Sequence, residues 1–205
     1  MKLFAISILK IDPAQTTEPL VCSSAVDVSD VGFFQRGAAK EFLIFLARTV
    51  TKRTPAMSRL QVNEQGNSLY SQSFAGGKLA VCVTCDKEYN SRVAFNLCTL
   101  VGEKFMSEFR GRWETVDKDN MLSWPELETI LKKYQNPAEA DKIMKIQNDI
   151  NSTKTVMVDA IDQVLARGEK IDDLVVRSQD LSDSSKVFYS TAKKTNSWCN
   201  GCVIA

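Results

Sequence analysis

Hydrophobic residues recur at alternating steps of three and four from residue 143 to residue 195, in a row that we call the seam. A period near 3.5 residues is typical of a helix that supercoils with partner helices. As one helix, this stretch would be about 80 Å long at ~1.5 Å per residue, too long for a small domain of its own. The seam therefore predicts a docking helix. Its members are Ile143, Ile146, Ile150, Thr153, Met157, Ala160, Val164, Arg167, Ile171, Leu174, Ser178, Leu181, Ser185, Phe188, Ala192 and Thr195.

Arg167 interrupts the seam at its centre, between Val164 and Ile171. A guanidinium carries five donors and stays charged. Leaving it unpaired inside a helix bundle would cost on the order of 3–5 kcal/mol. We therefore expect partner helices to bring acceptors, such as glutamine carbonyls, to this layer. The alternative is a solvated arginine at a loosely used position, because polar residues at the seam also set the register of ordinary coiled coils.

The pattern before residue 136 switches between strand-like alternation and helix-like periodicity. Strands are predicted at 2–11, 20–28, 59–64, 69–74 and 78–84, and helices at 30–51, 91–109 and 123–134. Asp30 and Asn90 or Ser91 are expected to cap the first two helices, and Ser123 to open the third with a capping box. This order predicts an α+β domain with a five-stranded antiparallel sheet flanked by helices.

Composition narrows the class of protein. A length of 205 residues allows one globular domain with an appendage. The net charge of +1 argues against a nucleic-acid binder. The absence of histidine removes Cys-His nucleophiles and His-ligated zinc. No stretch reaches the ~18 apolar residues of a membrane span, so we expect a cytosolic protein with free or modified cysteines.

Two of the six cysteines form a C-x-x-C, at Cys82 and Cys85. They fall in a predicted strand, where side chains three residues apart point to opposite faces and cannot easily share a metal ion. We interpret them as core residues, together with Cys22 and Cys98. No other combination of residues supports catalysis, so we expect neither an enzyme nor a metal or other cofactor.

The sequence ends with Cys202-Val203-Ile204-Ala205, the pattern of a prenylation box whose terminal alanine favours farnesyl. One lipid chain gives only marginal, reversible membrane binding. Cys199 lies three residues upstream and is a candidate for palmitate or a second prenyl group. The sequence thus predicts covalent lipids as the membrane anchor, with Cys199 making the anchoring switchable.

Three features together carry a family resemblance: the central Arg167 within Val164–Ile171, the order of strands and helices, and the Cys202 box. They resemble a prenylated, Ykt-type longin R-SNARE of the synaptobrevin family. The resemblance implies a longin (profilin-like) domain at 1–135, a heptad-repeat SNARE helix at 136–198 and a lipidation tail at 199–205. In this family the two lipidated cysteines are usually adjacent, whereas two residues separate them here.

The resemblance also implies a function. Arg167 would enter the central layer of a bundle with three Q-SNARE helices, and zippering toward the membrane would draw two bilayers together. The implied partners are a prenyltransferase, the SNARE disassembly machinery and membranes, but not nucleic acid. The implied location is a cytosolic pool and the cytoplasmic face of Golgi, vesicle and endosomal or vacuolar membranes. The alternative function is a lipid-anchored trafficking adaptor or tether that uses its N-terminal domain as a binding module.

A free seam would expose apolar surface in the cytosol, which favours aggregation. The apolar stripe of the first predicted helix, through Phe42 and Phe45, is wider than one sheet face needs. We therefore hypothesise a closed state, with the seam folded back on this stripe in pieces that break at Gly168. The alternative for Phe42 is ordinary core packing. Ser178 and Ser185 lie on the seam, where a phosphate would block bundling.

Overall fold

The computed structural model describes residues 2–12, 18–64, 66–136 and 154–195. The strands are β1 (Leu3–Lys10), β2 (Leu20–Val26), β3 (Ser58–Glu64), β4 (Asn67–Phe74), β5 (Leu79–Asp86) and β6 (Lys154–Val158). The α-helices are α1 (Arg36–Arg53), α2 (Ser91–Glu108), α3 (Glu126–Tyr134), α5 (Ile171–Arg177) and α6 (Asp183–Thr195). Short 3₁₀ helices include η1 (Phe33–Gln35) and η4 (Ile161–Gln163).

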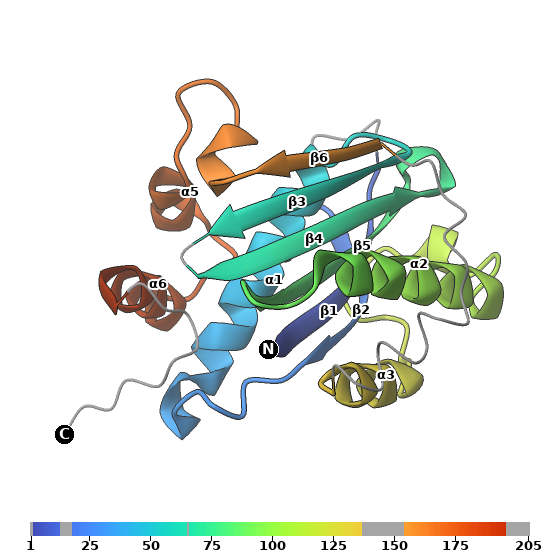
Figure 1. Ribbon diagram of the computed structural model, residues 1–205, viewed down its shortest axis with the longest axis horizontal. Coiled ribbons are helices and arrows are strands. Elements are labelled where there is room, and N and C mark those ends of the chain that lie inside the picture. The colour runs from blue at the N-terminus through green and yellow to red at the C-terminus, as the bar shows by residue number, and fades with distance from the viewer. Residues whose placement is uncertain (1, 13–17, 65, 137–153, 196–205) are drawn as a thin grey trace.

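The strands form one sheet in the order β2-β1-β5-β4-β3-β6 (Figure 1). The first five strands in this order pair antiparallel, which confirms the predicted α+β domain. The sixth strand was not predicted. It comes from the seam segment and pairs parallel with β3, from Ser58 opposite Lys154 to Val62 opposite Val158.

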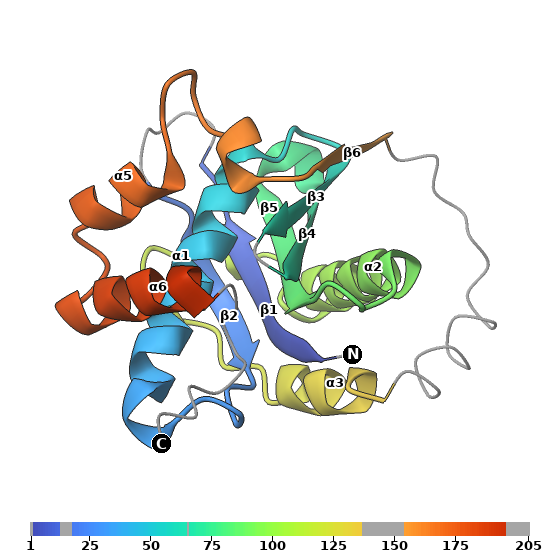
Figure 2. The same ribbon diagram turned by 60° about the vertical axis from the view of Figure 1, so that its left-hand side comes forward.

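Helices cover both faces of the sheet. Figure 2 shows α1 on one side, with α5 and α6 around it, and α2 and α3 on the other. Because both faces are covered, the central strands are apolar almost throughout: β1 and β5 are each buried at every position except the last. Cys82 packs into the α1-side core and Cys85 into the α2-side core, so the prediction that they face opposite ways is confirmed.

Two predicted helix starts are wrong. Asp30 does not cap α1, which begins six residues later after the 3₁₀ turn η1; Asp30 instead forms an ion pair with Lys2. The side chain of Ser123 does not cap α3 either, because Pro125 is the cap residue and no side-chain hydrogen bond closes that end. The predicted cap of α2 is confirmed, since Asn90 accepts a hydrogen bond from the amide of Arg92.

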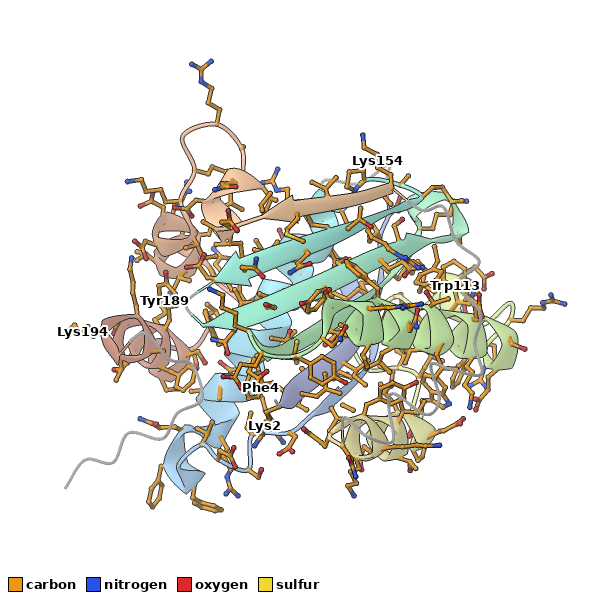
Figure 3. All side chains as sticks on the ribbon, in the orientation of Figure 1. Lys2, Phe4, Trp113, Lys154, Tyr189 and Lys194 are labelled. Atoms are coloured by element: carbon orange, nitrogen blue, oxygen red, sulfur yellow. The ribbon has the colours of Figure 1, made fainter. Side chains whose placement is uncertain are left out.

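Residues 154–195 do not form one helix. They comprise β6, η4, α5 and α6, and Figure 3 labels Lys154 at the start of this segment and Tyr189 and Lys194 near its end. Gly168 lies in the break before α5 with φ +86°, in the left-handed region that glycine adopts most readily. The amide of Ile171, at the start of α5, donates to Asp162 at 2.8 Å. Among the described residues, no helix is long and apolar enough to cross a membrane.

Candidate interaction site: the α1 face covered by residues 154–195

Aromatic packing between α1 and α6 forms the centre of the site. Phe42 is fully buried, with its ring centroid 6.2 Å from that of Phe188 and 5.1 Å from that of Tyr189. Phe45 stacks on Phe42 at 6.3 Å but is only partly buried. Rings at these separations interact favourably beyond the area they bury. Phe42 is therefore the main contact of α1 with α6.

A hydrogen-bonded cluster joins Glu41 of α1 to the beginning of α6. The Ser182 hydroxyl donates to Glu41 at 2.7 Å and the Ser182 amide at 3.2 Å. The Ser185 hydroxyl lies 2.5 Å from Glu41 and 3.2 Å from the carbonyl oxygen of Ala38. These bonds, from Ser185 first and Ser182 second, hold the pKa of the Glu41 carboxyl below its ordinary value. Ser185 itself is completely buried.

A second acidic group joins α5 to α6. Asp172 accepts a hydrogen bond from the Tyr189 hydroxyl at 2.6 Å and pairs with the Lys193 ammonium at 2.5 and 2.7 Å. The hydrogen bonds from Lys193 and then Tyr189 lower the pKa of Asp172. Burial, followed by the bond to Asp172, raises the pKa of Tyr189. The two helices thus contact α1 as a linked pair.

Ion pairs surround a cleft of about 500 Å³ between α1 and the α5 region, lined in part by Phe45 and Leu174. Arg48 pairs with Asp180 at 3.0 Å and also with Asp119. Arg53 pairs with Glu169 at 3.0 Å. The contact between α1 and the segment is thus apolar at its centre and charged along this cleft.

The sheet edge holds the first part of the segment. Val156 and Val158 of β6 are partly buried against the α1-side core, while Met157 between them is 60% exposed. Immediately after β6, the amide of Ile161 donates to Glu64 of β3 at 3.0 Å, and the Ile161 side chain is fully buried. Backbone pairing and one buried side chain therefore anchor this end.

The predicted seam residues divide into three groups. Ile171, Leu181 and Phe188 are buried, and Val164 and Leu174 are partly buried, all against the α1-side core. Met157 and Arg167 are exposed, and Arg167 lies in the turn beside Gly168. Of the other seam positions, Ser185 and Ala192 are buried and Ala160 and Ser178 are partly buried. Ile143, Ile146, Ile150 and Thr153 of the seam, and Cys199 and Cys202 of the tail, lie outside the described residues.

Sequence reasoning missed four buried residues of the segment. Ile161, Leu165, Val175 and Tyr189 pack into the same core, and none of them belongs to the seam. A signal existed, because these are large apolar residues at positions that a solvated face of a bundle helix would not need. Among the described residues, no group of three or more cysteine, aspartate or glutamate side chains could hold a metal ion.

Comparisons with known proteins identify two family matches along the chain. The family model described as a regulated-SNARE-like (longin) domain matches residues 28–137, and the synaptobrevin model matches residues 142–201. The two matches define the class: a longin domain followed by a synaptobrevin-type SNARE segment.

Relatives that match nearly the whole chain identify the family within this class. The chain is 42% identical to the VAMP-like protein YKT61 of Arabidopsis thaliana over 199 residues, which are 97% of this chain and 98% of the relative. It is 42% identical over 200 residues to the Synaptobrevin homolog ykt6 of Schizosaccharomyces pombe, with the same coverage of each chain. It is 40% identical to the Synaptobrevin homolog YKT6 of Saccharomyces cerevisiae over 88% of this chain and 90% of the relative.

The chain therefore belongs to the Ykt6 family of longin-type synaptobrevins. Membership makes it an R-SNARE of vesicle trafficking, a class that acts with other SNAREs at membranes and is not enzymatic. The resemblance seen in the sequence is confirmed.

Proposed function

We propose that residues 154–195 alternate between two mutually exclusive arrangements. In one they cover α1 and the β3 edge. In the other they form a SNARE helix that zippers with three Q-SNARE helices, with Arg167 facing glutamines in the central layer, and so drive membrane fusion. One observation carries the proposal: Ile171, Leu181 and Phe188 belong to the seam and are buried on the longin domain. A side chain packed there cannot also fill a bundle layer.

Strand β6 makes the two arrangements incompatible at the backbone as well. In the strand, Val156 and Val158 face the core and Met157 faces solvent, as an alternating pattern requires. In a bundle helix Met157 would occupy a seam layer, so residues 154–158 must leave β3 before that layer can form. The longin domain therefore acts as an autoinhibitory partner of the seam, with Phe42 and Phe45 on its inhibitory face.

The last part of the proposal concerns the lipid anchor at the C-terminal cysteines. The longin domain occupies residues 1–135, the SNARE motif 136–198 and the lipidation tail 199–205. A prenyltransferase attaches farnesyl to Cys202, and Cys199 takes palmitate or a second prenyl group. A cytosolic pool then exchanges with the cytoplasmic face of Golgi, vesicle and endosomal or vacuolar membranes, and the SNARE disassembly machinery recycles assembled bundles. The Cys202-Val203-Ile204-Ala205 sequence and the family membership support this assignment.

The test is the rate at which the full chain joins three Q-SNARE helices. Phe42→Glu places a carboxylate opposite the rings of Phe188 and Tyr189, which should release α6 and raise the assembly rate about tenfold or more, because a buried unpaired charge is strongly unfavourable. Phe34→Glu is the matched control, since Phe34 is 97% exposed and should leave the rate unchanged.

A second variant separates opening from damage to the longin domain. Tyr189→Ser changes only α6, removing one ring from Phe42 and one hydrogen bond from Asp172, and should also speed assembly. If neither Phe42→Glu nor Tyr189→Ser accelerates assembly while both remain folded, the autoinhibitory arrangement is refuted. Arg167→Leu then distinguishes fusion from tethering: a fusion protein loses activity in a vesicle-fusion assay, whereas a tether retains its membrane bridging.

A further inference from the structure

Two adjacent aromatic side chains project into solvent just before α1. Phe33 is 76% exposed and Phe34 is 97% exposed, and their rings meet edge to face at 5.6 Å. Figure 1 and Figure 2 both show the first turns of α1 extending beyond the sheet. Exposed apolar patches of this kind usually mark a surface that another body covers. Neither ring contributes to either buried core.

The fold holds this pair outward in a defined way. Val31 is buried, and the Arg36 guanidinium donates to the carbonyl oxygens of Val31 and Ser29, each at 3.1 Å. The same guanidinium lies 5.8 Å from the centre of the Phe33 ring. The turn is therefore braced from beneath, and the two rings form a convex tip rather than the lining of a groove.

The chemistry around the tip favours a lipid surface over a protein pocket. Arg36 and Lys40 follow the two rings in the chain and are exposed, while the nearby acid Asp30 is paired with Lys2. Phenylalanine at a tip with cations behind it is the composition of elements that insert into the interface of an anionic bilayer. The carboxylate of Glu41 is held by the serines of α6 and does not oppose this contact.

We infer that Phe33 and Phe34 form a membrane-insertion tip that contacts anionic phospholipid while the tail holds the chain at the same surface. The eight residues that follow Lys194, up to Cys202, span up to about 27 Å when extended, at ~3.4 Å per residue. Tyr189 of α6 contacts Phe42, which lies about two turns along α1 from Phe34. An anchored tail and the tip can therefore reach one bilayer together, and two weak contacts then act as one strong contact. α6 covers α1 from Ala38 onward, so the tip is free even in the folded-back state.

Tryptophan fluorescence of the tethered full chain tests this inference. The chain carries Cys199→Ser and Trp198→Phe and is coupled through Cys202 to a maleimide lipid in vesicles of phosphatidylcholine and phosphatidylserine. Supplying the tether chemically makes the result independent of which lipid the natural protein carries. Phe34→Trp is the probe, and Met121→Trp is the matched control, because Met121 is 51% exposed and adjoins Asp119 and Asn120, which contact Arg48 and β2 far from the tip.

We expect the Phe34→Trp emission to shift to the blue and to be quenched at least about twofold more than the control by lipids with shallow spin labels. Arg36→Gln with Lys40→Gln should reduce this quenching. Equal quenching of the two probes overturns the inference, and a tip that docks on a protein instead also gives no quenching in these protein-free vesicles. Phe33→Ser with Phe34→Ser should leave bundle assembly in solution unchanged, so this test and that of the proposed function can fail separately.

Discussion

The two faces of the sheet are closed in different ways. On the α2 side, the rings of Phe105, Phe109 and Trp124 pack together with centroids 4.8 to 6.2 Å apart, and every residue of that core precedes residue 135. On the α1 side, the core is complete only with residues from 161 to 192, and the contact includes the polar clusters around Glu41 and Asp172.

This difference shows how one sheet can have one face that stays packed and another face whose covering helices, α5 and α6, can detach. An apolar interface that loses its partner exposes surface at a cost of roughly 25 cal/mol per Å². Intramolecular hydrogen bonds exchange for bonds to water when they open, so each contributes only about 1 kcal/mol net. The α2 side also has polar contacts, such as Trp124 to Glu108, but its core is closed by residues of the longin domain itself. The α1 side is closed by a later segment, which is held in part by the polar clusters around Glu41 and Asp172.

The largest expected effect is on stability, and it should differ between variants of the two cores. Phe105→Ala removes a fully buried ring from the α2 side and should lower the free energy of unfolding by about 3–5 kcal/mol. Phe188→Ala removes a ring from the cover and should mainly release α6. Denaturant unfolding of the longin domain measures the first change, and hydrogen exchange of α6 measures the second. Equal losses of global stability would contradict the distinction.

A negative charge at Ser185 is expected to have the second-largest effect. The Ser185 hydroxyl is completely buried beside the Glu41 carboxylate, so Ser185→Asp places two like charges together at a cost of about 2 kcal/mol or more. We expect α6 to detach and its amides to exchange rapidly. Ser184→Asp is the matched control one residue away, because Ser184 is exposed. Protection of α6 that survives Ser185→Asp would show that this cluster does not hold the cover.

Acid should loosen the cover that α5 and α6 form over α1. The folded-state pKa of Glu41 lies below its ordinary value of 4.5, so its stabilising contribution is full above that value and is lost as the pH falls through the lowered pKa. The pKa of Asp172 is likewise lowered from its ordinary value of 3.8, so its stabilising contribution is also lost as the pH falls. The measurement is α6 exchange protection as a function of pH below 5, and Glu41→Gln should flatten the profile. An unchanged profile in that variant would exclude Glu41 as the titrating group.

The smallest expected effect concerns the ion pair between Arg53 and Glu169. Both side chains are about one-third exposed, so their coupling should be only about 0.2–1 kcal/mol and should fall with added salt. A double-mutant cycle with Arg53→Gln and Glu169→Gln, read from the opening of α5, measures it. A coupling that salt does not change would mean that the pair is more deeply buried than its exposure indicates.

The two faces were also unequally predictable from the sequence. Local patterns located β1 to β5, α2 and most of α1, because alternation, turn residues and the Asn90 cap act over a few residues. The seam pattern and the wide stripe through Phe42 together led to the hypothesis that the seam folds back on α1, and Ile171, Leu181 and Phe188 do pack into the α1-side core. Strand β6 could not be predicted, since Val156 and Val158 gain their burial only from β3, almost 100 residues earlier.

The central claim is that residues 154–195 cannot cover the longin domain and form a SNARE bundle at the same time. Hydrogen exchange of the full chain, before and after three Q-SNARE helices are added, tests it most directly. The account predicts that assembly protects residues 154–195 while the β3 amides facing β6 lose protection and β5 and α2 stay unchanged. A stable bundle in which β3 keeps its full protection would contradict the account.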